Sequence, residues 1–124
     1  MSINPKKLFL IDGLGALFSA FMLGFVLVWL EEYFGIPIHI LYILSVFPIL
    51  FFIYDMLVFR LVEKRIRLFL KVISVLNILY CILSLILFFG HYQELRLLGW
   101  IYIISEILIV LIIAGIEWKT ASKI

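Results

Sequence analysis

The stretch that decides the fold is residues 68–89, LFLKVISVLNILYCILSLILFF, in which Lys71 is the only charged residue. As an α-helix it would be roughly 33 Å long, enough to cross a hydrocarbon core about 30 Å thick. Runs of similar length and character occupy residues 8–30, 37–59 and 97–118. The sequence therefore predicts an all-α protein: four transmembrane helices in an up-down-up-down, left-handed bundle, forming one domain over residues 1–124.

The composition excludes an ordinary soluble domain. Of the 124 residues, 67% are hydrophobic and 15% are charged, and the mean hydropathy is +1.31. Soluble domains are about half apolar and about a quarter charged, so both values differ from theirs in the direction that a bilayer requires. The only cysteine is Cys81, which leaves no intrachain disulfide and no CxxC redox motif.

The positions of the charges predict the orientation. Nine of the ten lysine and arginine residues fall at run ends that share one side of the membrane: Lys6, Lys7, Arg60, Lys64, Arg65, Arg67, Lys71, Lys119 and Lys123. Arg96 falls on the other side, together with the acids Glu31, Glu32 and Glu94. Cytoplasmic loops carry the excess of lysine and arginine, so we expect a multi-pass protein of the inner (plasma) membrane with both termini cytoplasmic.

Small residues in the first run predict a helix-packing seam. Helices in lipid associate through small side chains and polar contacts, because the tails around them are as apolar as leucine. The candidate seam contains Gly15, Ala16, Ser19, Ala20 and Gly24. In the second run, Pro48 cannot donate a backbone hydrogen bond, and we expect a kink there.

An intramembrane polar cluster is predicted from depth. Asp12, Asp55 and Lys71 each lie a few residues inside the cytoplasmic end of their runs, at a common level about 6 Å from that boundary. Asn77 and Glu106 lie near the middle of theirs. An ionisable group in hydrocarbon costs roughly 2.5 to 3.5 kcal/mol on insertion scales, which makes each one a functional candidate.

Each member of this cluster also has a structural interpretation. The long side chain of Lys71 can reach the headgroups, or it can pair with Asp12 and Asp55. The two aspartates can meet interfacial water, form a static clip with Lys71 or serve a function. Glu106 can be a neutral acid that is hydrogen-bonded to Asn77, or a site that binds a proton or a cation.

No constellation of residues predicts a reaction. The sequence contains no glycine-rich phosphate loop, no nucleophile elbow, no HExxH motif and no haem-ligating histidine pair within the runs. His39 and His91 both fall near the outer boundary, and their spacing does not support a metal site. We therefore predict no catalytic residue, no cofactor and no metal, and a net charge of +2 gives no reason to expect nucleic acid.

The segment LFLIDGLGA, residues 8–16, together with the four-run plan, resembles short four-helix bacterial inner-membrane proteins, a group that implies no activity. The size is also similar to that of small multidrug resistance transporters, which use four helices and a glutamate in the first. This sequence departs from that pattern, because its deep glutamate, Glu106, is in the fourth run and its charge bias is one-sided.

Three function classes follow from these residues. The first is a non-enzymatic accessory or interaction bundle, embedded in the lipid bilayer and partnered by a homo-oligomer or a membrane subunit. The alternative is a proton- or ion-coupled small transporter or channel that uses Glu106 with Asp12 and Asp55. The third is a membrane enzyme acting on a lipid-like substrate.

Overall fold

The computed structural model describes residues 4–123, which form helices joined by short loops, with no strand among them. The helical elements are α1 (Pro5–Phe21), η1 (Met22–Val26), α2 (Leu27–Trp29), α3 (Glu31–Phe34), α4 (Ile38–Leu61), α5 (Ile66–Gly90) and α6 (Leu97–Lys123). α1, η1 and α2 run together as one helix, so four helices are long and apolar enough to cross a membrane. The predicted all-α, four-helix membrane fold is confirmed, and the protein is a small, multi-pass integral membrane protein.

The four long helices extend a few residues beyond the predicted runs. The first begins at Pro5 rather than Leu8, because the Asn4 side chain accepts a hydrogen bond of 3.0 Å from the backbone N–H of Lys6 and proline suits a first helical turn. The last continues to Lys123, past the predicted end at Trp118. Glu117 therefore lies inside α6, six residues before its end.

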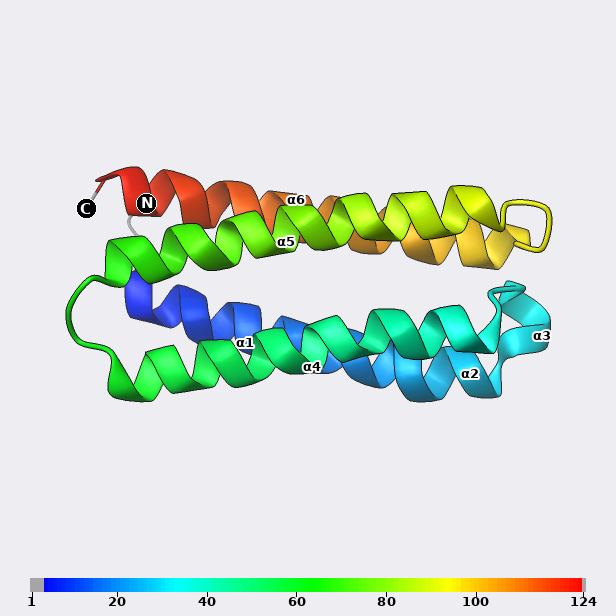
Figure 1. The fold of residues 1–124 in the computed structure, drawn as a ribbon, viewed down its shortest axis with the longest axis horizontal. Helices are drawn as coiled ribbons and strands as arrows, with labels where there is room; N and C mark the ends of the chain where they lie inside the picture. Colours follow the sequence, from blue (N-terminus) through cyan, green and yellow to red (C-terminus); the bar gives the residue numbers. More distant parts are fainter. Residues whose placement is uncertain (1–3, 124) are drawn as a thin grey trace.

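The helices form two antiparallel hairpins (Figure 1). The first hairpin, residues 5–61, pairs the composite first helix with α4, and the second, residues 66–123, pairs α5 with α6. Most interhelical contacts fall within these pairs, and far fewer join one hairpin to the other. The start of α1, the end of α6 and the α4–α5 loop lie at the same end of the bundle.

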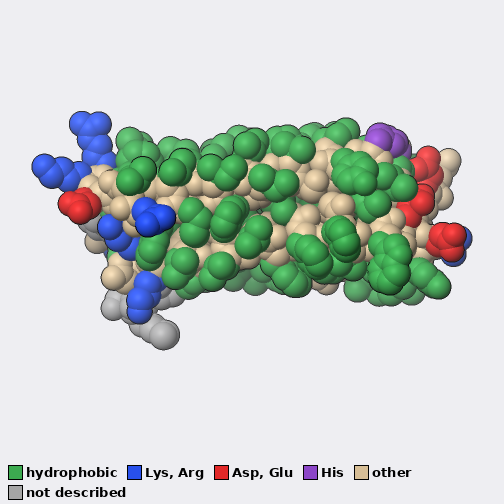
Figure 2. All heavy atoms as spheres, turned by 90° about the horizontal axis from the view of Figure 1, so that it is seen from below, with side chains coloured by type: hydrophobic (Ala, Val, Ile, Leu, Met, Phe, Trp, Pro, Cys, Tyr) green, Lys and Arg blue, Asp and Glu red, His purple; other side chains and the backbone are tan. Residues whose placement is uncertain are grey.

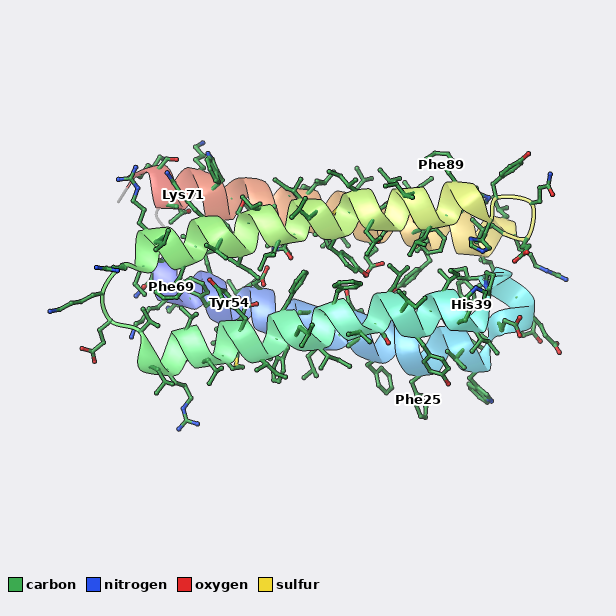
Figure 3. All side chains as sticks on the ribbon, viewed as in Figure 1. Phe25, His39, Tyr54, Phe69, Lys71 and Phe89 are labelled. Carbon is green, nitrogen blue, oxygen red and sulfur yellow. The ribbon has the colours of Figure 1, made fainter. Side chains whose placement is uncertain are left out.

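The charged side chains lie at the two ends, with a hydrophobic belt between them on the face shown in Figure 2. We call the end with the termini and the α4–α5 loop the basic end, and the end with α3 and the α5–α6 loop the acidic end. Large apolar side chains are exposed along the helices, and Phe25 points away from the bundle (Figure 3). Such a surface fits lipid as its solvent.

The stripe of α1 that packs on α4 differs from the predicted seam. Gly13 is buried, and a Cβ there would lie 2.5 Å from Met56 Cε and 3.1 Å from Asp55 Cβ. At 3.6 residues per turn, Gly13, Ala20 and Gly24 share one face, and Gly24 approaches Ser45. Gly15 is exposed, with no neighbouring atom within 4 Å of a Cβ built on it.

The predicted seam therefore combined two faces of one helix. Ala20 and Gly24 belong to the stripe that Gly13 begins, whereas Gly15, Ala16 and Ser19 line a pocket. α4 continues as a helix through Pro48, and the kink there stays a prediction. The regular helix is instead interrupted at η1, a π turn in which the Leu27 N–H bonds to the Met22 carbonyl.

Backbone contacts tie the two hairpins at the acidic end. The N–H of Arg96 donates to the carbonyl of Phe34 over 3.0 Å, and Gly99 lies so close to the same carbonyl that a Cβ there would overlap it. Gly35 ends α3 at φ 73°, a conformation that favours glycine.

Nearer the basic end, the Tyr54 hydroxyl of α4 donates to the Phe69 carbonyl of α5 over 2.9 Å, and the two residues lie near each other in Figure 3. The hairpins are thus joined by hydrogen bonds toward both ends of the bundle.

Candidate functional site: acidic groups around an intramembrane pocket

Polar side chains are buried inside the bundle. Eight polar or charged residues are buried among residues 4–123, and they come from all four long helices: Asp12, Ser45, Asp55, Ser74, Asn77, Ser84, Glu106 and Glu117. Four of the eight are carboxylic acids, and no lysine or arginine is buried with them among residues 4–123. Charges buried in proteins are normally paired, so the acids require an explanation.

Asn77 of α5 joins two of the acids. Its Nδ2 donates to Asp12 Oδ1 over 2.8 Å and to Glu117 Oε1 over 3.0 Å, so one amide contacts α1 and α6 together. The exposed fractions of Asp12, Asn77 and Glu117 are 5%, 5% and 0%. These are interhelical hydrogen bonds away from water, the type of contact that holds membrane helices together.

Asp55 of α4 completes what we call the acid cluster: Asp12, Asp55 and Glu117 with Asn77. Both Asp55 oxygens, Asp12 Oδ2 and Glu117 Oε2 are buried and meet no hydrogen-bond donor among the described residues. Asp12 and Glu117 share the Asn77 amide, and Asp55 lies against Gly13, which follows Asp12 in the chain. Ionised carboxylates only accept, so any bond between two of these acids requires that one of them carries a proton.

Glu106 lies apart from the acid cluster. It is 7% exposed and accepts a hydrogen bond of 3.2 Å from the Tyr80 hydroxyl of α5. Asn77 bonds to the acid cluster, so the hydrogen bond considered from sequence between Asn77 and Glu106 is replaced by two others. The donor to Glu106 is thus a hydroxyl, that of Tyr80, rather than an amide.

One pocket brings the two acidic groups together. Its volume is about 200 Å³, and residues from all four long helices line it, including Asp12, Asn77, Tyr80 and Glu106. No lysine, arginine or histidine is among the lining residues. Most of the wall is apolar or aromatic, with a few polar groups converging on it, which is the usual character of a ligand site.

Lys71 stands outside this arrangement. Its Nζ lies 4.9 Å from the centre of the Trp118 ring, and it forms no ion pair with any described carboxylate. Figure 3 shows it on the second hairpin, toward the basic end. The pairing with Asp12 and Asp55 considered from sequence is not formed, because Asp12 and Asp55 face the interior between the hairpins.

Glu117 is the site residue that sequence reasoning missed. The predicted last run ends at Trp118, and Glu117, next to that end, is not among the predicted members of the polar cluster. Its signal was its spacing: it follows Glu106 by eleven residues, three helical turns, so both acids lie on one face of α6. Gly99, Ile103 and Ala114 are buried along the same helix.

The two histidines lie elsewhere. The ring centres of His39 and His91 are 5.8 Å apart, and His91 Nδ1 lies 2.8 Å from the Leu87 carbonyl. His39 is near the start of α4, toward the acidic end (Figure 3). Across residues 4–123, no group of three or more histidine, cysteine, aspartate or glutamate side chains is arranged to hold a metal ion.

Comparison of the chain with protein-family models, with curated proteins and with solved structures finds no match. Its function has to be argued from its own residues.

Proposed function

We propose that this membrane protein is a small proton-coupled transporter, in which Glu106 and the acid cluster bind and release protons beside a shared pocket. The observation that carries the proposal is the pocket itself: it is bordered by Asp12 and by Glu106 and by no basic residue. Acids inside a bilayer are expensive and are functional candidates by default, and lining a cavity is how such groups are used.

The hydrogen bonds support function over a purely structural role. A static polar network is expected to satisfy every buried member, because an unpaired buried polar group costs about 1 to 3 kcal/mol. Here four carboxyl oxygens of the acid cluster have no donor among the described residues. Acids that bind and release protons are expected to lack fixed donors, since each acid must exist both with and without its proton.

The depth of the acids suggests a route. Following the positive-inside rule, we place the basic end in the cytoplasm. The acid cluster then lies nearer the cytoplasm than Glu106 does. Glu106 lies about 16 Å from Glu117 along α6, near the middle of the membrane. Asp12 belongs to the acid cluster and also lines the pocket, so protons from the cytoplasm would reach Glu106 by way of Asp12 and the pocket.

The test is proton flux into proteoliposomes that contain the purified protein and a trapped pH-sensitive dye, after a pH gradient is imposed. We expect flux above that of protein-free vesicles, and a loss of about tenfold or more in Glu106→Gln, which keeps the shape and removes the titrating group. Glu94→Gln is the matched control, because Glu94 is exposed at the acidic end and should leave flux unchanged. Flux equal to protein-free vesicles, or unchanged in Glu106→Gln, would contradict the proposal.

A second candidate, an accessory subunit that packs on a partner, is favoured by a different observation. Gly15, Ser105 and Gly115 are small, exposed residues on α1 and α6, away from the helix ends. Small residues let a neighbouring membrane helix approach closely. Crosslinking in native membranes at Gly115→Cys tests this function, and failure to recover any partner or oligomer would count against it.

A further inference from the structure

The pocket has a mouth on the side of the bundle. Four of its lining residues are exposed, Gly15 and Phe18 on α1 and Ser105 and Ile109 on α6, and all four lie toward the middle of those helices. Few contacts join α1 directly to α6. The pocket therefore opens between α1 and α6 at mid-height, where a bilayer presents acyl chains rather than water.

The charged groups that line the pocket favour a cation over an anion as its ligand. Two carboxyl groups, those of Asp12 and Glu106, border it without a basic residue, and Asp12 has an oxygen, Oδ2, that is buried and without a donor. An anion would meet only like charge. A cation would meet an acid and could form the ion pair that the described residues do not supply.

The aromatic residues of the pocket fit the same ligand class. Phe18, Phe51, Tyr80 and Tyr102 all line it, and the rings of Phe51 and Tyr80 lie edge to face with centres 6.0 Å apart. Aromatic rings attract organic cations through their negative faces, most strongly where water is excluded. Carboxyl groups combined with aromatic walls suit an alkylammonium group better than a small, strongly hydrated metal ion.

The volume limits the size of the bound group. An apolar cavity of about 150 Å³ holds a benzene molecule. The pocket, at about 200 Å³, has room for a slightly larger group, such as a ring with a short ammonium arm. Any longer tail would have to leave through the mouth into the lipid.

We propose that this pocket binds a small organic cation, a quaternary or protonated amine, which reaches it sideways from the lipid between α1 and α6. The proposal rests on the proposed function and names its cargo. A proton and an organic cation cannot both neutralise the same carboxylate, so the two ligands compete. Binding of the cation releases a proton from the site, and binding of a proton releases the cation.

The experiment measures equilibrium binding of benzyltrimethylammonium to the protein in nanodiscs, corrected for uptake by empty nanodiscs. Neopentylbenzene, the uncharged molecule of the same shape, is the matched ligand. We expect saturable binding of the cation that tightens as pH rises, about tenfold weaker binding in Asp12→Asn and Glu106→Gln, and normal binding in Glu94→Gln. Saturable binding of both ligands with equal affinity, or of neither, would overturn the proposal.

A pair of glycine variants tests the lateral route. Gly15→Trp places a large side chain at the mouth, and Gly115→Trp places the same side chain on α6 outside the pocket; a Cβ added to either glycine would have no neighbouring atom within 4 Å. We expect Gly15→Trp to slow benzyltrimethylammonium association about tenfold and Gly115→Trp to leave it unchanged. Equal rates in the two variants would overturn the lateral route.

The outcome is separable from that of the proposed function. Proton flux that depends on Glu106 together with no cation binding would refute the cargo and leave proton coupling standing. Cation binding that does not change with pH and releases no proton would refute the coupling.

Discussion

The contacts within each hairpin and the contacts between the hairpins are of different kinds. Within the first hairpin, Gly13 and Gly24 bring α1 close against α4. Within the second, Ser74 Oγ donates to the Ala114 carbonyl of α6 over 2.8 Å. Between the hairpins lie the acids, Asn77 and a pocket of about 200 Å³.

This difference separates stability from function. Close, small-residue packing is the main source of helix association in lipid, and away from the acidic end, where Gly99 packs on Phe34, it is found inside each hairpin. The space between the hairpins keeps acids without donors and a pocket, which close packing would eliminate. A protein that binds a ligand between its hairpins can thus keep each hairpin rigid while the contact between them changes.

The largest effect on stability should come from filling the seam of the first hairpin. Gly13→Leu adds a side chain where even a Cβ would lie 2.5 Å from Met56 Cε, so α1 and α4 must separate. We expect a loss of about 3 kcal/mol in the free energy of unfolding, the upper part of the usual range for overpacking. Unfolding in mixed micelles by titration with sodium dodecyl sulfate measures it.

Gly15→Leu is the control for that variant, because it adds the same side chain to the same helix where nothing lies within 4 Å. We expect its stability to stay within about 0.5 kcal/mol of wild type. Equal losses in the two variants would show that α1 packs on another face than the one described.

The next effect concerns the donors to the buried acids. Asn77→Leu removes the one amide that bonds to both Asp12 and Glu117, and we expect a loss of about 2 kcal/mol, since two buried carboxyls lose their donor. Tyr80→Phe removes a single hydroxyl from Glu106, at a cost of about 0.6 kcal/mol, a typical interhelical hydrogen bond. The same titration compares them. Equal losses in the two variants would show that the bond of Asn77 to Asp12, which joins the hairpins, adds nothing to what one bond inside the second hairpin contributes.

The smallest effect is expected at Lys71, which lies outside the pocket and the acid cluster. Lys71→Ala removes a cation from the Trp118 ring of the same hairpin, a contact worth about 0.5 kcal/mol at a partly exposed position. Proton flux in proteoliposomes should stay at the wild-type level. A large loss of flux would mean that Lys71 interacts with the acids in a state other than this one.

Sequence reasoning predicts the fold well for a physical reason. Run length and composition are imposed by the thickness and polarity of the bilayer, so segments such as residues 68–89 indicate a spanning helix without any knowledge of tertiary contacts. The ends of the helices are less determined, because Asn4 and Pro5 lengthen α1 through local capping. That uncertainty was enough to hide Glu117.

The site is predictable only in part. Depth along each run placed Asp12 and Asp55 at one level and Asn77 nearer the middle with Glu106, whereas Asn77 bonds to Asp12 and to Glu117. Depth does not give the direction in which a side chain points, so Lys71 was grouped with acids that it does not contact. The axial offset of α5 against α6 decides which side chain donates a hydrogen bond to Glu106. Tertiary packing sets this offset, for example through the contact of Ser74 with Ala114.

The central claim is that acids beside the pocket exchange protons, and infrared difference spectroscopy tests it most directly. Spectra of the protein in lipid at low and high pH report the carbonyl stretch of protonated carboxyl groups. The account predicts pH-dependent carboxyl bands in the wild type, with one band missing in Glu106→Gln and another changed in Asp12→Asn. Bands identical to wild type in both variants would contradict it.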